Sequence, residues 1–196
     1  MNNNKHKISN RDIALQAAAT LFLTKGFQVT SMDDIVAHSK VSKTNIYYHF
    51  KSKEELLLVI VDQLVYHYEQ RIHWVLSQKE VSAPNKLELI LQALTEEQEE
   101  NDYLGGCPFL TLYTQTANES SEVKGKIQAF FERQFDSIQL LLTEGIANKE
   151  IRESLPVPQI AALIISSIEG ALFIAKASNK PALLQDLSSA LASLLK

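Results

Sequence analysis

The run from Ser31 to Lys53, SMDDIVAHSKVSKTNIYYHFKSK, constrains the fold most, because it predicts two short helices around a tight turn. Ser42 follows the turn and can cap the second helix with its hydroxyl. Val41 before this cap and Ile46 after it have the spacing of a hydrophobic staple. Ile46 and Phe50 lie one helical turn apart and are predicted to point inward. The sequence therefore predicts a helix-turn-helix unit.

The outer face of the second helix concentrates donors, acceptors and aromatic rings near its N-terminus, where a recognition helix meets base edges and phosphates. The residues left on this face are Lys43, Thr44, Asn45, Tyr47, Tyr48 and His49. An ordinary solvated helix face is the alternative interpretation. We expect the segment 43–45 and Tyr47 to read bases or sugars, with Ser42 beside them at the DNA-binding surface. Phosphate contacts are expected from Tyr48, Lys53 and Thr30 or Ser31.

The charges of the chain are segregated along its length. Residues 1–53 carry eight Lys and Arg against three Asp and Glu, a net charge of +5, whereas residues 54–196 carry −9 and the whole chain −4. A basic end on an acidic body is typical of a protein that touches phosphates with one end only. We therefore expect a DNA-binding head over residues 1–53 and a body over residues 54–196.

The composition also narrows the class of protein. One cysteine rules out an intramolecular disulfide framework and fits a reducing cytoplasm. The N-terminal residues MNNNKHKISN lack the apolar core of a secretory signal. The apolar runs Leu56–Val61 and Ile160–Ile168 are well short of the ~20 residues that a membrane span needs. We expect a soluble cytoplasmic protein with no membrane partner.

Caps and breaks divide the chain into about nine helices, and the sequence shows no strand pattern, so the predicted fold class is all-α. Ser9 with Asp12 is expected to open the first helix, and Gly26 to end it. Capping boxes are expected at Ser31 and at Ser52, the second with Glu55. The remaining helices are expected to start near Ser42, Pro84, Pro108, Ser120 or Ser121, Pro158 and Pro181.

The segment 159–178, QIAALIISSIEGALFIAKAS, is apolar nearly all round. A helix without a polar face is buried on both sides, and the same helix of a second copy can supply the second cover. Gly170, Ala171 and Ala175 would let two such helices approach closely. We expect a homodimer formed through the last two helices.

Residues 9–60 resemble the N-terminal domain of TetR-family transcriptional repressors of the AcrR/TetR type. The resemblance follows the first helix with Phe22 and Gly26-Phe27, then residues 30–35, 42–50 and 53–56. It implies a three-helix helix-turn-helix DNA-binding domain on a helical, dimeric, ligand-binding body. Scattered body positions are similar to the drug-responsive repressors related to LmrA and YxaF, namely Gly106-Cys107-Pro108, Ser166, Glu169, Gly170 and Ala171.

Two positions depart from the family pattern. Lys40 stands at the turn where the family often has Gly, so a non-Gly residue must lie in or near the left-handed region. Thr44-Asn45 stands where a Gly-Thr or Gly-Ser pair is common. The Asn45 amide can pair with adenine, so the operator preference of relatives does not transfer to this chain.

The predicted body helices carry aromatic and polar side chains that can line a mostly apolar pocket with few polar anchors. Ordinary core packing is the simpler interpretation of each one taken singly. The candidate ligand-binding residues are Trp74, Cys107, Leu110, Thr111, Thr114, Phe131, Phe135, Glu169 and Phe173, with Phe109, Tyr113, Phe130 and Gln134 nearby.

Glu169 and Cys107 are the chemically distinctive members of this set. A carboxylate within an apolar helix needs a partner, and either a cationic amphipathic ligand or a hydrogen bond across the dimer interface can supply one. Cys107 precedes Pro108 at a helix start, where the backbone dipole can lower the pKa of a thiol. A redox or electrophile sensor would use this placement, whereas a small buried hydrophobe is the simpler interpretation.

His67 and His73 do not face together, and no Cys or carboxylate completes a metal set. The sequence contains no catalytic constellation, so we expect no metal, no cofactor and no enzymatic activity. The favoured hypothesis is a ligand-responsive homodimeric repressor of a near-palindromic operator, released by a small lipophilic, cationic or electrophilic effector. The alternatives are a ligand-independent regulator whose body only dimerises and a repressor that senses electrophiles through Cys107.

Overall fold

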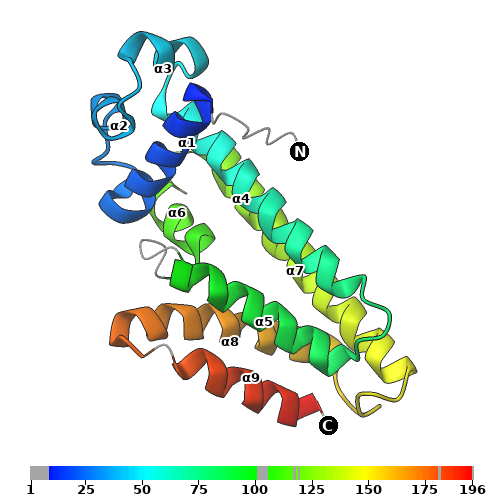
Figure 1. The fold of residues 1–196 in the computed structure, drawn as a ribbon. Coiled ribbons are helices and arrows are strands. Elements are labelled where there is room, and N and C mark those ends of the chain that lie inside the picture. Colours follow the sequence, from blue (N-terminus) through cyan, green and yellow to red (C-terminus); the bar gives the residue numbers. More distant parts are fainter. Residues whose placement is uncertain (1–8, 101–105, 117, 119, 181, 196) are drawn as a thin grey trace, which may run out of the picture.

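The computed structural model describes residues 9–100, 106–116, 118, 120–180 and 182–195, and it is helical throughout these ranges apart from short turns (Figure 1). The all-α prediction and the count of nine α-helices are confirmed for these residues. The elements are α1 (Asn10–Leu21), a π-helical segment η1 (Phe22–Gly26), α2 (Met32–Ser39), α3 (Lys43–His49), α4 (Lys53–Leu76), α5 (Ala83–Glu100), α6 (Pro108–Thr116), α7 (Ser121–Ala147), α8 (Val157–Ser178) and α9 (Ala182–Leu195).

The head consists of α1, η1, α2 and α3, which pack on one another around fully buried apolar side chains. Phe22, Ile35, Ile46 and Phe50 each expose at most 1% of their surface. Ser9, Ser31 and Ser42 cap α1, α2 and α3 as predicted, each accepting a hydrogen bond from the backbone N–H three residues on. Local caps therefore fix where each helix of the head begins.

Two local details differ from the sequence expectation. The first helix passes into η1 before Gly26, whose φ is +106°, ends it. Thr20 and Thr24 donate their hydroxyl protons to carbonyls one turn back, a contact that bends helices. At α4, Ser52 accepts from the Glu55 N–H, but the Glu55 carboxylate accepts from the N–H of Lys51 instead of closing a full capping box.

The body consists of α5 to α9 together with the long helix α4, which leaves the head beside α7 (Figure 1). The first turns of α4 pack against α1, and its later turns pack against α5 and α7. Helix α8 packs against α7 and α9, and α9 also packs against α5. Helix α6 contacts η1, so both α4 and α6 connect the head to the body.

Helix α8 is, within the part of the chain that the structure describes, the one helix long and apolar enough to cross a membrane. Core helices of soluble proteins have the same length and composition, and α8 buries Ile164, Ile168 and Leu172 inside the body. Its opposite face leaves Leu163, Phe173 and Ile174 exposed. One side of α8 is therefore covered within the chain, and the other is not.

Candidate DNA-binding surface and ligand cavity

The recognition helix α3 presents Ser42, Lys43, Thr44 and Tyr48 to solvent, whereas Asn45, Tyr47 and His49 are half-buried on the same surface. Lys40 adopts the left-handed conformation predicted for the turn, with φ +58°, and its N–H donates to the carbonyl of Val36. This turn sets α3 across α2 and leaves the N-terminal end of α3 open.

Lys43 forms an ion pair with Asp33 of α2, with 2.8 Å between Nζ and Oδ1. This hydrogen bond raises the pKa of Lys43. The Lys43 ammonium also lies 5.9 Å from the centre of the Tyr47 ring. Asn45 differs from its neighbours, because its side-chain oxygen is buried and has no hydrogen-bond partner among the described residues. The surface thus carries Lys43, whose charge is paired with Asp33, and Asn45, whose amide oxygen has no partner among the described residues.

Thr30 and Lys53, which the sequence predicts near DNA phosphates, bond to backbone carbonyls of the head in this DNA-free structure. Thr30 is 1% exposed and donates its hydroxyl proton to the carbonyl of Gly26 at 2.6 Å. Lys53 Nζ donates to the carbonyls of Phe27, Gln28 and Thr30 at 2.9, 3.2 and 3.3 Å. Carbonyls left open by the end of a helix attract a cation, so a DNA phosphate would compete with these carbonyls for Lys53.

Ser31 lies on the surface, but its hydroxyl is also occupied. It accepts from the backbone N–H of Asp34 and donates to the Asp34 carboxylate at 2.7 Å. The hydroxyl and backbone N–H of Ser31, together with Lys25 at 2.9 Å, lower the pKa of Asp34 well below its ordinary value. Ser31 therefore stabilises the start of α2, and a DNA phosphate would have to share the Ser31 hydroxyl with Asp34.

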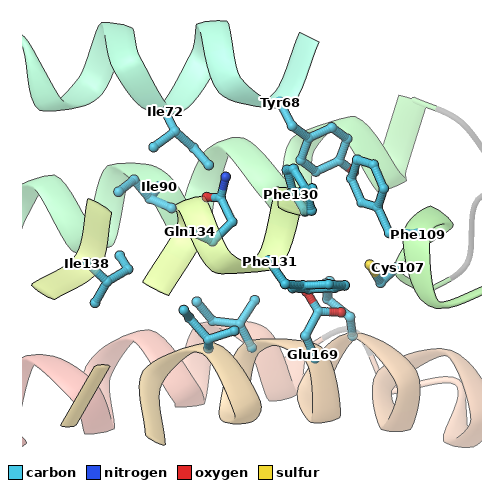
Figure 2. A pocket seen from close by; sticks show the side chains of 13 residues that line it. Tyr68, Ile72, Ile90, Cys107, Phe109, Phe130, Phe131, Gln134, Ile138 and Glu169 are labelled. Atoms are coloured by element: carbon cyan, nitrogen blue, oxygen red, sulfur yellow. The ribbon is translucent and has the colours of Figure 1, made fainter. Parts of the chain in front are cut away.

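The body contains a cavity of about 50 Å³ between α4, α5, α7, α8 and the start of α6 (Figure 2). A single water molecule needs ~10–15 Å³ by this measure, so the cavity has room for a few. Its lining is mostly aliphatic and aromatic, with Gln134, Cys107 and Glu169 as the polar exceptions. The lining residues are Tyr68, Ile72, Ile90, Cys107, Phe109, Phe130, Phe131, Gln134, Ile138, Ile165, Ile168, Glu169 and Leu172.

The side chains of Glu169 and Cys107 lie close together on the wall of this cavity and point toward one another (Figure 2). Burial raises the pKa of Glu169, and a hydrogen bond from the Cys107 thiol lowers it in part. The second carboxylate oxygen, Oε2, is buried without a partner among the described residues. Glu169 thus faces the interior, which does not favour the interface hydrogen bond considered from the sequence.

The expectation of a lowered thiol pKa at Cys107 is wrong in this structure. Burial raises the pKa of Cys107 well above its ordinary value, and the neighbouring Glu169 raises it further. The backbone N–H groups of Phe109 and Leu110 act in the predicted, lowering direction. Desolvation of the thiolate outweighs these helix N-terminal donors.

The structure brings together Cys107, Phe131 and Glu169 of the predicted ligand residues and places the other six elsewhere. Trp74 is 62% exposed in an outer groove between α4 and α5, and Phe173 is 69% exposed on the uncovered face of α8. Phe135 packs beside the core, outside the cavity lining. The hydroxyl of Thr111 donates to the carbonyl of Cys107, that of Thr114 donates to the carbonyl of Thr111, and Leu110 lies at the surface.

Several lining residues were not singled out from the sequence as ligand candidates. They come mainly from α4 and α8 and are Tyr68, Ile72, Ile90, Ile165, Ile168 and Leu172. Helical spacing marks each as a core residue but does not show which core positions border a cavity. Within the described residues no group of three His, Cys, Asp or Glu side chains is placed to hold a metal ion.

The chain matches two family models. Residues 14–60 match the model of bacterial regulatory proteins of the tetR family, and residues 83–191 match the tetracyclin repressor-like C-terminal domain. The chain is 24% identical over 164 residues to the HTH-type transcriptional repressor ComR of Escherichia coli, covering 84% of this chain and 78% of ComR.

Solved structures show the same fold. A TetR transcriptional regulator from Chloroflexus aurantiacus superposes with a TM-score of 0.81 at 27% identity, over 94% of this chain and 92% of that one. The regulator FadR of Bacillus subtilis, crystallised in complex with stearoyl-CoA, gives a TM-score of 0.73 at 23% identity over 93% and 96%. This chain therefore belongs to the TetR family, whose members are DNA-binding transcriptional regulators and not enzymes.

Proposed function

We propose that this regulator is a homodimeric repressor whose two heads bind a near-palindromic operator and which a small lipophilic ligand releases. The observation that carries the ligand response is the mostly apolar cavity lined by Glu169, whose second carboxylate oxygen has no partner among the described residues. Two heads must sit ~34–36 Å apart to occupy successive major grooves. A ligand that prefers another separation therefore lowers operator affinity.

The proposed DNA-contacting surface is the exposed end of α3. Ser42, Lys43, Thr44 and Asn45 lie at the helix N-terminus, where base edges are reached, and Tyr47, Tyr48 and His49 flank them. Ser31 lies at the start of α2 as a further phosphate contact. We assign Thr30 and Lys53 to stabilising the turn at residues 26–30, because both side chains bond to its carbonyls.

The proposed dimer forms through α8 and α9. The uncovered face of α8 carries Leu163, Phe173 and Ile174, which water would otherwise surround. An added Cβ at Gly170 would meet nothing within 4 Å inside the chain, so Gly170 leaves room for a second helix. A soluble family and a single cysteine support a cytoplasmic location.

The proposed ligand is lipophilic and carries a cationic or hydrogen-bond-donating group for Glu169. Apolar surroundings make an unpaired carboxylate costly, and a cation that enters the cavity removes this cost. The cavity must widen to admit more than a few atoms. The stearoyl-CoA complex of FadR is a precedent for a lipophilic ligand on this fold. The raised thiol pKa of Cys107 argues against the electrophile-sensing alternative.

The small size of the cavity favours a second candidate function, a ligand-independent regulator whose body only dimerises. The two are separated by selecting bound duplexes from random DNA and repeating the binding assay with tetraphenylphosphonium, a lipophilic cation. We expect the cation to weaken operator binding in the wild type and less so in Glu169→Gln. Unchanged binding with a broad panel of lipophilic cations, acids and neutral compounds would favour the second candidate. Failure to recover any enriched duplex would reject both.

A further inference from the structure

The turn at residues 26–30, between η1 and α2, is held by both helices that connect the head to the body. Helix α4 supplies Lys53, whose ammonium binds the Phe27 carbonyl at 2.9 Å. Helix α6 supplies Gln115, whose side-chain oxygen accepts from the Phe27 N–H at 2.7 Å. A single residue of the head thus has its N–H fixed by one body helix and its carbonyl by another.

Gln115 makes a second contact with the same turn, since its backbone carbonyl accepts from the Gln28 side-chain amide at 3.4 Å. Phe27 is itself anchored in the head, where its ring is 2% exposed and lies edge-on to Phe22 at 5.0 Å. A displacement of Gln115 is therefore transmitted to a buried part of the head and not to a loose surface loop.

The other end of α6 borders the ligand cavity. Cys107 immediately precedes the helix, and Phe109 in its first turn lines the cavity and stacks on Phe130 of α7 at 3.9 Å. The nine residues of α6 span ~13 Å as one rigid element. Figure 1 shows α6 lying between the head and the remainder of the body.

We propose that Gln115 is the positioning residue that couples occupancy of this cavity to the placement of the head. The proposal rests on the ligand response proposed above. A molecule larger than the present cavity displaces its lining, including the start of α6 at Cys107 and Phe109. A hydrogen bond tolerates only a few tenths of an ångström of extension, so the Gln115 contact with Phe27 either pulls the turn or breaks.

The test is a double-mutant cycle that uses a cavity-filling side chain in place of a ligand. Ile168→Phe fills the cavity from α8 without altering α6, and Leu172→Phe serves the same purpose if the first variant does not fold. Each is combined with Gln115→Ala, which removes the acceptor, and with Gln115→Glu, which retains one. Gln128→Ala, an exposed Gln on α7, is the matched control. Affinity is measured on the full dimer with a duplex selected from random DNA.

We expect Ile168→Phe to weaken operator binding at least five-fold in the parent chain and in the Gln115→Glu and Gln128→Ala backgrounds. In the Gln115→Ala background the same substitution should change affinity less than two-fold. Hydrogen exchange at the Phe27 amide should be faster in the single variant Gln115→Ala than in the wild type, because this N–H loses its acceptor. If Gln115 only stabilised the fold, Gln115→Ala would change the operator affinity of every variant by the same factor. Ile168→Phe would then weaken binding as much in that background as in the parent chain.

Two results overturn the proposal, and they have different meanings. If cavity filling weakens binding equally with and without the Gln115 acceptor, the ligand response stands and the role of Gln115 is rejected. If cavity filling leaves operator affinity unchanged in the parent chain, the cavity does not communicate with the head, and the ligand response is rejected together with the role of Gln115.

Discussion

The head and the body differ in where their polar groups find partners. In the head, serine caps and Thr30 bond backbone groups one helical turn away, whereas Lys53 at the start of α4 bonds carbonyls distant in sequence. In the body, the carboxylate of Glu169 is buried with one oxygen unpartnered among the described residues. The bonds that hold the head together are therefore mostly local, and each region keeps one unpartnered buried acceptor, Asn45 Oδ1 on the proposed DNA surface and Glu169 Oε2 in the proposed ligand cavity.

The largest effect that tests this contrast is expected from Ile46→Ala. Ile46 is fully buried in α3, and truncating such a residue costs ~2–5 kcal/mol of unfolding free energy. If local bonds make the head a separate folding unit, the head of this variant should unfold before the body. Far-ultraviolet circular dichroism should then show an early transition, while fluorescence of Trp74, the single tryptophan and a body residue, keeps its wild-type midpoint.

A single shared transition, displaced equally for both signals, would show that the head and the body unfold as one unit. Val123→Ala provides the matched control in the body, because Val123 is equally buried in α7. In that variant the transition reported by Trp74 should move.

The second effect concerns Glu169. Its pKa is raised in the folded chain, so folding binds a proton there as pH rises above the ordinary carboxyl value, and the unfolding free energy falls across that window. Above the folded pKa the full cost of burying the charge remains. Glu169→Gln should therefore be more stable at pH 8 by ~1–3 kcal/mol, because the neutral amide has no charge to desolvate, and nearly equal to wild type at pH 4.

Thermal unfolding at the two pH values measures this difference. A wild-type chain that matches the variant at both pH values would mean that Glu169 is already satisfied and that the cavity holds no unpartnered acceptor. Glu132→Gln, on the exposed side of α7, should show no such pH dependence.

The predictability of the two regions follows from the same contrast. Ser9, Ser31, Ser42 and Ser120 cap helices as expected, because a cap depends on residues within one turn. The cavity depends on how whole helices are rotated against each other. Residues 165, 168 and 172 of α8 face the cavity, with Glu169 at the edge of this stripe and Phe173 beyond it. A sequence pattern shows that this stripe is apolar, but it does not show which edge of the stripe borders the cavity.

The same limit explains why the contacts of Lys53 could not be predicted from the sequence. From the sequence it is one of eight cations in a basic head, and nothing local distinguishes it from Lys43. Only the fold brings the carbonyls at residues 27, 28 and 30 around its ammonium. Long-range pairing of a cation with backbone carbonyls leaves no periodic signal.

The third effect tests this difference between lysines. Lys43→Ala should weaken operator binding about ten-fold, either at all sequences or at one base pair, and leave the melting temperature within about one degree of wild type. Lys53→Ala should lower the melting temperature, because three carbonyls lose their partner. Competition binding over a series of salt concentrations separates the two. Lys124→Ala, on the exposed surface of α7, controls for loss of one charge. Equal thermal and binding losses in both lysine variants would place both side chains in the same role.

The smallest effect is expected from Asp33→Asn. This substitution tests whether the ion pair between Asp33 and Lys43 limits DNA binding by the head. Asp33 holds Lys43 at 2.8 Å with both side chains largely exposed, so the pair adds little stability. Removing it frees the ammonium for a phosphate and takes one negative charge away from the interface. Affinity for random duplex should rise two- to five-fold at low salt and converge with wild type as salt increases. Asp62→Asn breaks an equivalent exposed pair with Lys126 in the body and should leave DNA binding unchanged. If Asp33→Asn instead weakens binding, the ion pair orients Lys43 for the groove, and the head, like the body, depends on a preformed polar contact for recognition.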